Sequence, residues 1–250
     1  MQYREYGKEH AETMLFLHGG GLSWWNYREA AEILQKKYHV ILPVLDGHAE
    51  SDRHFTTIED NAAEIIAFAE EHCGGRLLLI GGLSLGAQTV LEVLAQKKDI
   101  AAHALIESAS VIPSKLTSAM IGPAFGSSWG LVQSRTFAKL QFRSLHMKEE
   151  LFEDYYRDTC RITKEDMIAF MKANTSYGLK DALRETCADV HIYAGEKETS
   201  GILRSADQIH ACIPGSEKII LPGLYHGEFS INHAEQFAAE VERIVTAQRQ

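Results

Sequence analysis

Short apolar runs alternate with segments of helical periodicity along most of the chain. The apolar runs predict buried strands at positions 14–17, 39–45, 76–81, 102–106, 189–194 and 218–221. Between them, apolar residues recur at helical spacing and predict helices over 24–37, 57–72, 87–94, 202–213 and 232–249. Strands that alternate with helices are typical of right-handed crossovers, so the pattern predicts an α/β fold with a mostly parallel central sheet flanked by helices.

The alternation stops between residues 113 and 185. This stretch has helical runs at 134–145, 149–160 and 164–174 but no convincing strand pattern. An inserted helical cap over the sheet is the economical interpretation. The sequence therefore predicts an α/β core formed by residues 1–112 and 186–250, with residues 113–185 as the cap.

Composition and charge narrow the class of protein. The 250 residues, 45% of them hydrophobic, can bury a substantial core, and the net charge of -9 argues against nucleic acid or an anionic membrane as a partner. The four cysteines are widely separated and have no metal-ligand spacing, so neither a metal site nor a disulfide framework is expected. Without a signal-peptide pattern or a membrane-length apolar run, we expect a cytoplasmic protein with a small-molecule partner. Its oligomeric state is not predicted.

The strand at 76–81 runs into Gly82-Leu83-Ser84-Leu85-Gly86, a G-x-S-x-G pattern. In such a turn, two glycines flank a serine held in a strained conformation, and strand and helix pass closely enough to expose its hydroxyl in a cleft. The pattern is short, so its position between an apolar strand and a helical segment is what makes it informative. Ser84 is therefore the candidate nucleophile.

A serine nucleophile needs an imidazole base, and the base should lie in a loop that follows a strand. Of the twelve histidines, His18, His48 and His226 have such positions. His226 follows the last strand in a glycine-flanked loop and completes the chain order serine, acid, histidine, so it is the predicted base. His233 is a weaker rival, and His18 is better interpreted as a structural residue that hydrogen-bonds neighbouring loops.

The acid that orients the histidine should follow the strand at 189–194. Glu198 is the preferred candidate because it lies far enough past Gly195 to turn back toward the end of the sheet. Glu196 and Glu107, which follows an earlier strand, remain alternatives.

Acyl transfer also requires donors for the developing oxyanion. The backbone N–H of Leu85 is one candidate, and the second is expected from the glycine loop after the first core strand, at Gly20 in preference to Gly21. The chain has neither a P-loop nor a G-x-G-x-x-G motif, so no nucleotide cofactor is expected.

Taken together, these motifs make the chain resemble the α/β-hydrolase family, specifically its small capped members with an H-G-x₇-W segment. The matching segments are Leu15–Gly21 with Trp24 or Trp25 after it, Leu45–Ser51, Gly82–Gly86, Gly195–Glu198 and Gly223–His226. The chain departs from the family pattern in having Glu as the acid and in a shortened Asp46–Ser51 turn that lacks a second glycine. The resemblance implies the α/β-hydrolase fold.

Substrate choice is expected to depend on the cap. Phe125, Trp129, Phe137 and Phe142 are candidates for an apolar acyl pocket, although packing between cap helices is the preferred role for most of them. Gly21 and Trp24 are further candidates for substrate contact. Arg135 and Arg143 are interpreted as exposed helix charges in preference to ligands for a substrate carboxylate.

The sequence thus predicts a serine hydrolase that cleaves a small ester or related acyl compound by way of an acyl-enzyme. Because one fold hosts many chemistries, two alternatives stay open. One is a hydrolase or lyase that breaks a C–C bond with the same residues. The other is a barely catalytic protein that binds a ligand as a signal.

Overall fold

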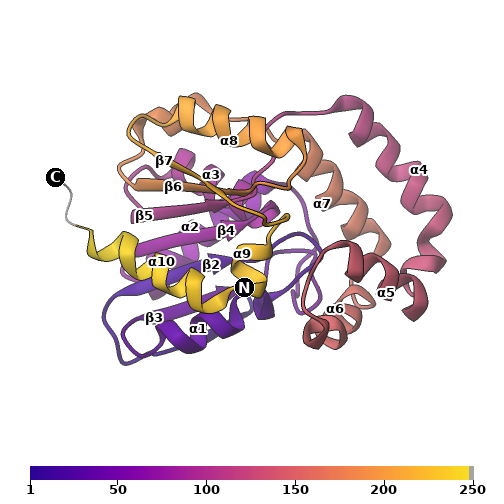
Figure 1. The fold of residues 1–250 in the computed structure, drawn as a ribbon, viewed down its shortest axis with the longest axis horizontal. Coiled ribbons are helices and arrows are strands. Elements are labelled where there is room, and N and C mark those ends of the chain that lie inside the picture. The colour runs from indigo at the N-terminus through magenta and orange to yellow at the C-terminus, as the bar shows by residue number, and fades with distance from the viewer. Residues whose placement is uncertain (248–250) are drawn as a thin grey trace.

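A central sheet forms the middle layer of the computed structural model, which describes residues 1–247, with residues 127 and 128 described in backbone only (Figure 1). Its seven strands lie in the order β1-β3-β2-β4-β5-β6-β7. β1 pairs antiparallel with β3, and the other strand pairings described are parallel. The strands are β1 (Tyr3–Tyr6), β2 (Thr13–Leu17), β3 (His39–Pro43), β4 (Leu77–Leu83), β5 (Ala101–Glu107), β6 (Asp189–Gly195) and β7 (Glu217–Leu221).

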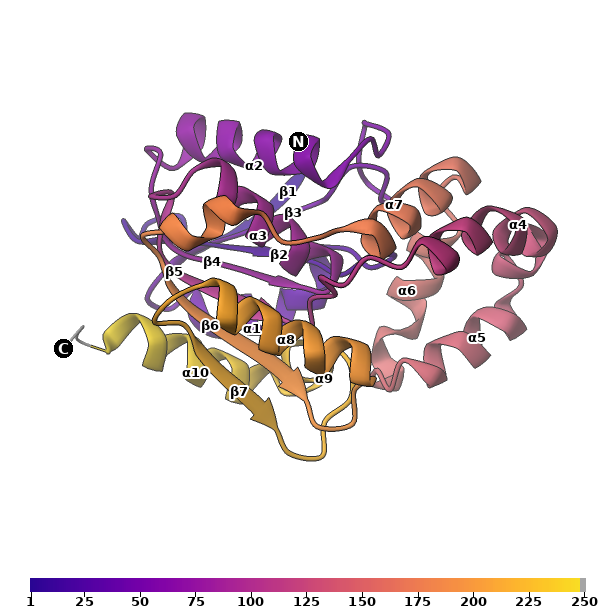
Figure 2. The same cartoon turned by 90° about the horizontal axis from the view of Figure 1, so that it is seen from above.

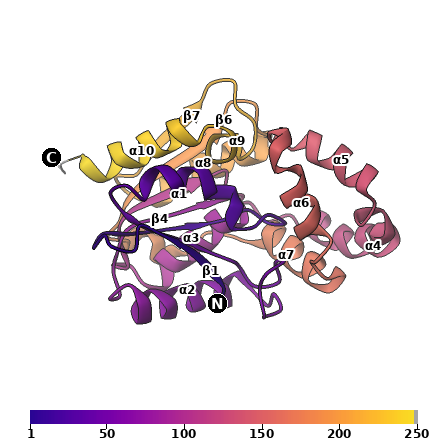
Figure 3. The same cartoon turned by 90° about the horizontal axis from the view of Figure 1, so that it is seen from below.

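Helices cover both faces of this sheet (Figure 3). Alternate strand residues feed two separate apolar clusters, because successive side chains point to opposite faces. Leu15, Ile80 and Ile106 belong to the cluster under α2, α3 and α8, whereas Phe16 and Leu105 belong to the cluster under α1, α9 and α10. The covering helices are α1 (Arg28–Leu34), α2 (Ile58–His72), α3 (Leu85–Gln96), α8 (Ser200–Cys212), α9 (Glu228–Asn232) and α10 (Ala234–Thr246).

Between β5 and β6, the described chain is helical and contains no strand. Figure 2 shows α4, α5, α6 and α7 gathered on one side of the sheet, at the end opposite the C-terminus. These helices span Lys115–Val132, Arg135–Ser144, Phe152–Thr159 and Lys164–Ser176, and the 3₁₀ turn η2 spans Glu149–Leu151. The following 3₁₀ turn η3 (Asp181–Glu185) instead contacts α3 and α8, and its Leu183 is buried in the sheet's own apolar cluster.

The strand pattern predicted from sequence matches the parallel strands, but β1 was not predicted. Its residues Tyr3, Arg4, Glu5 and Tyr6 are all half-buried at the edge of the sheet, so they lack the apolar run that marks the inner strands. The predicted helix over 24–37 is a 3₁₀ turn, η1 (Trp24–Tyr27), followed by α1. The predicted closing helix corresponds to α10, and its predicted end at 249 lies outside the described residues; the short helix α9 before it was not predicted.

Within residues 1–247, no helix has both the length and the apolar character needed to cross a bilayer. All four cysteines are free.

Candidate active site

Ser84 lies at the sharp turn between β4 and α3. Its backbone has φ 53° and ψ -110°, a conformation that L-residues rarely adopt and that costs on the order of 1–3 kcal/mol. The turn is anchored because the N–H of Ser84 donates to the carbonyl of Glu107 at 2.9 Å. In this conformation Ser84 is partly exposed, whereas the residues on either side of it are buried.

The two glycines of the turn are required by close packing. A Cβ on Gly82 would lie 2.5 Å from the carbonyl carbon of Gly86, and a Cβ on Gly86 would lie 2.1 Å from the carbonyl oxygen of Leu17. Both contacts are with backbone, which cannot move aside as a side chain can. The G-x-S-x-G pattern therefore reflects the close passage of α3 over β4 and β2.

Glu198 and His226 come together from loops after β6 and β7. Glu198 Oε2 lies 2.7 Å from His226 Nδ1, and the Glu198 side chain is 1% exposed. Its other oxygen, Oε1, accepts hydrogen bonds from the Ser108 hydroxyl at 2.5 Å and from the Gly195 N–H at 3.3 Å. A carboxylate only accepts hydrogen bonds, so this contact places the His226 proton on Nδ1 and leaves Nε2 as an acceptor.

Gly195 allows the two loops to meet. A Cβ at this position would lie 2.2 Å from the carbonyl oxygen of Leu224, and the N–H of Lys197 donates to the same carbonyl at 3.0 Å. Gly227, directly after His226, has φ +69°, and a Cβ there would press on the Leu83 side chain. Glycines thus fix the separation between the acid loop, the histidine loop and the strand that precedes Ser84.

The other candidate acids have different surroundings. Glu196 is exposed and accepts a hydrogen bond from the Gly223 N–H at 2.9 Å, so it caps a turn. Glu107 is buried, and its Oε1 accepts from the Ser230 N–H at 3.3 Å. Among the carboxylates weighed from sequence, only Glu198 has a described hydrogen bond to His226. Ser108, which supports it, was not predicted, although it directly follows β5 at the same edge of the sheet.

A cavity of about 210 Å³ connects Ser84 and His226. Its remaining lining is mostly apolar and comes from the glycine loop, β4, the segments around α5 and α7, and α9. These lining residues are Gly19, Gly20, Leu22, Leu83, Leu145, Met147, Met171, Asn174 and Ile231. The His226 side chain is 45% exposed, so the cavity opens to solvent on the histidine side.

The glycine loop after β2 approaches the start of α3. A Cβ built on Gly20 would contact the Leu85 side chain at 3.5 Å, which places the two residues side by side at the cavity. Within the described structure, the N–H groups of Gly20 and Leu85 have no hydrogen-bond partner, whereas the N–H of Gly21 donates to His48 Nε2 at 3.1 Å. Of the two glycines considered from sequence, Gly20 is thus the one with an available donor.

Two buried histidines support this loop. His18 Nε2 accepts from the Leu45 N–H at 3.1 Å, and its Nδ1 faces the Gly19 carbonyl at 2.9 Å. Burial holds the pKa of His18 well below its usual value and lowers that of His48 to about 4, so both imidazoles are neutral at neutral pH. The prediction that His18 links neighbouring loops agrees with these contacts.

Four residues predicted to contact substrate do not line this cavity. The ring of Trp24 lies under the Arg4 guanidinium, and its N–H points to Glu50 at 3.4 Å. The N–H of Gly21 donates to His48, while Phe125 and Trp129 pack against the apolar cluster under α2, α3 and α8. Phe125 and Trp129 thus pack in the fold, which the sequence analysis preferred for most of these aromatic residues, whereas the contacts of Trp24 were not predicted.

The predicted cap residues also have packing roles. Phe142 packs against Phe152 and Tyr155, with ring centroids 5.4 and 5.3 Å apart, so it joins α5 to α6. Arg135 pairs with Glu153 and is exposed, and Arg143 is exposed as well.

Glu107 gives a testable pH dependence. Burial raises the pKa of this carboxyl from 4.5 to about 7. Between these values the folded chain keeps a proton that the unfolded chain has released, so stability falls as the pH rises through this window. Relative to Glu107→Gln, the wild type is expected to lose up to about 3 kcal/mol of unfolding free energy between about pH 5 and about pH 8. Urea unfolding of both proteins measures this, and a difference that does not change with pH would contradict it.

Comparison with known proteins places the chain in a family. The model of the alpha/beta hydrolase family matches residues 14–240. A search of curated protein sequences gave no significant match. Among solved structures, an enol-lactonase from Burkholderia xenovorans LB400 is similar with a TM-score of 0.83 and 15% identity, over 98% of this chain and 96% of that one.

Two esterases are similar to a comparable extent. One, from Exiguobacterium antarcticum, has a TM-score of 0.83 and 17% identity, over 98% of this chain and 95% of that one. The other is a thermophilic esterase from Thermogutta terrifontis, with a TM-score of 0.80 and 16% identity, over 98% and 94%. At these identities the structural likeness shows the fold, and it confirms the predicted α/β-hydrolase architecture. Because the family model matches most of this chain, residues 14–240, the chain belongs to the alpha/beta hydrolase family.

Proposed function

We propose that this protein is a serine hydrolase that cleaves small carboxylic esters or related acyl compounds. The observation that carries the proposal is the Glu198–His226 contact of 2.7 Å beside a cavity that also exposes Ser84. Glu198 keeps the His226 proton on Nδ1, so Nε2 is available to accept the proton of the serine hydroxyl. The strained turn presents that hydroxyl to the same cavity.

In the proposed mechanism, Ser84 attacks the acyl carbon while His226 accepts its proton. The N–H groups of Gly20 and Leu85 donate to the oxyanion. Leu85 is the first residue of α3, so the positive end of the helix dipole also stabilises the negative charge there. His226 then protonates the leaving group, and the acyl-enzyme is hydrolysed when water attacks with His226 again as base. Ester cleavage is favoured over C–C cleavage because similar structures include two esterases and an enol-lactonase.

The cavity favours a short acyl group. Its volume of about 210 Å³ is below the range of roughly 300–1,000 Å³ typical of sites for drug-sized ligands. Leu22, Met147 and Ile231 are buried and border it, which suits an apolar chain of few carbons. We further propose that α4–α7 act as a cap, since α7 and the end of α5 supply part of the lining.

Labelling and chain-length preference test the proposal together. A fluorophosphonate probe should label Ser84, as located by peptide mass spectrometry. With p-nitrophenyl esters, kcat/KM should be highest for acetate to butyrate and fall by about tenfold or more at octanoate, because each extra methylene overfills a packed site. A burst of p-nitrophenol would report the acyl-enzyme.

A cavity variant and a matched control sharpen this test. Met171→Ala enlarges the cavity and should shift the preference toward longer chains, whereas Met120→Ala on the exposed face of α4 should leave it unchanged. Absent labelling and absent burst, with turnover of a diketone, would instead support C–C bond cleavage. Ligand binding without measurable turnover would support the signal-binding alternative.

A further inference from the structure

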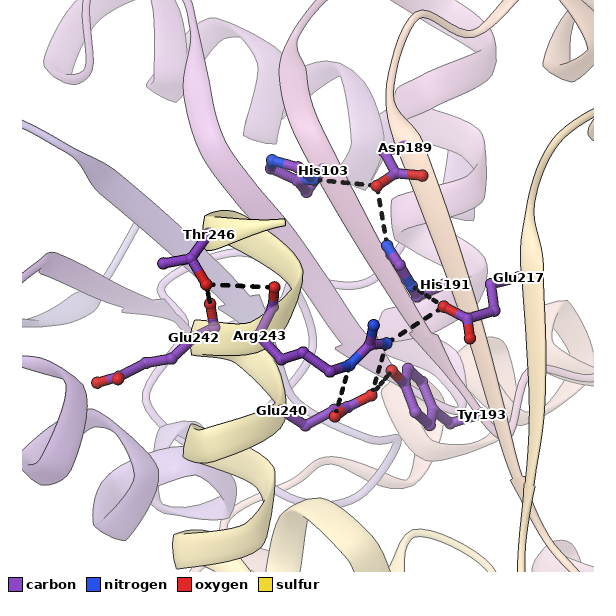
Figure 4. Close-up of polar contacts among 9 residues, drawn as sticks. All are labelled: His103, Asp189, His191, Tyr193, Glu217, Glu240, Glu242, Arg243 and Thr246. Atoms are coloured by element: carbon purple, nitrogen blue, oxygen red, sulfur yellow. Dashed lines mark hydrogen bonds and ion pairs between the residues drawn. The ribbon is translucent and has the colours of Figure 1, made fainter. Parts of the chain in front are cut away.

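A second cluster of chemically active side chains lies at the opposite end of the sheet from Ser84. His103 is near the start of β5, and Asp189 and His191 are at the start of β6, whereas the active-site residues follow the strands' carboxyl ends. His103 is the register partner of Asp189, and His191 lies two residues further along β6. All three therefore project from the same face of the sheet, the face covered by α10 (Figure 4).

The distances within the cluster resemble those of a metal site. His103 Nδ1 lies 3.4 Å from Asp189 Oδ2, and His191 Nε2 lies 3.0 Å from the same oxygen. Ligand atoms about 2.0–2.1 Å from a tetrahedral zinc ion are about 3.4 Å from one another. All three atoms lie within 4.8 Å of one another, so the two imidazole nitrogens need to approach by at most about 1.4 Å to reach that spacing.

A supporting shell of the kind found around zinc ligands is also present. His191 Nδ1, the ring nitrogen away from Asp189, lies 3.0 Å from Glu217 Oε2. Glu217 is in turn held by the Arg243 guanidinium of α10 at 3.2 Å, and Arg243 also pairs with Glu240, which accepts from the Tyr193 hydroxyl at 2.5 Å (Figure 4). A carboxylate that binds the second nitrogen of a ligating histidine fixes its orientation and directs the lone pair of the other nitrogen toward the metal.

The three side chains of the cluster differ in exposure, as expected for an ion that also binds one water molecule. The side chains of His103 and His191 are 10% and 6% exposed, and that of Asp189 is 30% exposed. The two imidazoles are thus largely buried, while the carboxylate is exposed enough for an ion and a water molecule to reach it. Two imidazoles and one carboxylate form a ligand set that zinc accepts together with a water molecule.

We propose that His103 Nδ1, Asp189 Oδ2 and His191 Nε2 bind a zinc ion, with Glu217 orienting His191. The ion would join β5 to β6 and, by way of Glu217 and Arg243, both strands to β7 and α10. The ion would lie away from the proposed catalytic residues, because its ligands are at the amino ends of strands whose carboxyl ends carry those residues. Without metal, the same contacts describe a histidine ion-paired with two carboxylates, which is the alternative that the experiment must exclude.

Metal titration of the untagged, chelator-treated protein tests the proposal. The wild type should bind one equivalent of Zn²⁺ in calorimetry, and its thermal midpoint should rise with free Zn²⁺. Co²⁺ at the same site should give the intense visible absorption of low-coordinate cobalt. His103→Gln and His191→Gln should abolish the bound equivalent, and Glu217→Gln should weaken binding by about 10- to 100-fold without removing a ligand.

His54→Gln is the matched control, because His54 also pairs with a carboxylate, Asp166, at 2.9 Å but is exposed and belongs to no three-residue metal-ligand cluster among the described residues. This variant should keep the wild-type stoichiometry and affinity. The X-ray absorption spectrum of the zinc-loaded wild type should show two imidazole ligands. This measurement uses only the wild type, so it remains valid if far-UV circular dichroism shows that His191→Gln does not fold. Zinc uptake by the wild type no greater than that of His103→Gln, or an absorption spectrum without imidazole ligands, would overturn the proposal and leave an ion-pair cluster only.

Discussion

Replacement of Ser84 by alanine is expected to lower kcat for p-nitrophenyl acetate by roughly 10⁵- to 10⁶-fold and to abolish labelling by a fluorophosphonate. The substitution removes the only atom that can form the acyl-enzyme and leaves the glycine contacts of the turn intact. Residual hydrolysis, if measurable, would come from water activated by His226 near the Gly20 and Leu85 donors. Stopped-flow kinetics with mass spectrometry of the labelled protein measures both losses.

Ser134→Ala is a matched control for this variant. Ser134 directly precedes α5, has no described side-chain capping bond and does not line the cavity, so both labelling and turnover should match the wild type. Ser84→Ala should unfold at a similar urea concentration to the wild type, because alanine must adopt the same strained backbone. Turnover close to the wild-type value in a folded Ser84→Ala protein would refute the proposed nucleophile.

Replacement of Glu198 by glutamine is expected to lower kcat by about 10⁴-fold with little change in shape. The glutamine amide can donate to His226 Nδ1, which shifts the imidazole proton to Nε2, where it prevents the base from accepting the serine proton. Glu198→Asp retains the charge on a shorter side chain and should recover part of the loss. The pH profile of kcat, measured with each variant, separates lost charge from lost position.

The rival acids provide the controls. Glu196→Gln changes an exposed carboxylate that binds only the Gly223 N–H, and it should leave kcat within about twofold of the wild type. Glu107→Gln removes a buried carboxyl with no described hydrogen bond to His226, so its effect should be on stability far more than on rate. A loss of about 10⁴-fold in Glu107→Gln with an active Glu198→Gln would reassign the acid.

The inner strands β2 to β6 could be predicted because they are buried on both faces and appear as continuous apolar runs. β7 is a half-exposed edge strand, and it could be predicted because it still has a short apolar run. Ser84 and His226 could be proposed for a related reason, since glycines mark the turns after these strands and the backbone contacts of Gly86 and Gly195 exclude any larger residue. Such local requirements are visible in a single sequence. β1 could not be found in this way, because a half-exposed edge strand requires no apolar run.

Contacts between distant segments were not predictable. Ser108 supports Glu198 only because β5 lies beside β6, and Met171 and Asn174 reach the cavity only because α7 crosses the end of the sheet. Likewise, the substrate roles predicted for Trp24 and Phe125 depend on the direction in which each side chain points. The sequence pattern does not determine that direction. The sequence search for metal ligands considered local spacing and so could not pair His103 with Asp189, which follows 86 positions later but is its neighbour in the sheet.

The placement of the helical segment between β5 and β6 has a consequence for folding. These two strands pair with each other although residues 108–188 lie between them in the sequence. Closing so long a loop costs chain entropy before any strand contact forms. The helices of that stretch are held by backbone hydrogen bonds between residues four positions apart and can form early, so the pairing of β5 with β6 is expected to be a late, slow step. Glu198 and His226 both come after this crossing, so recovery of hydrolytic activity during refolding should lag behind the recovery of helix content.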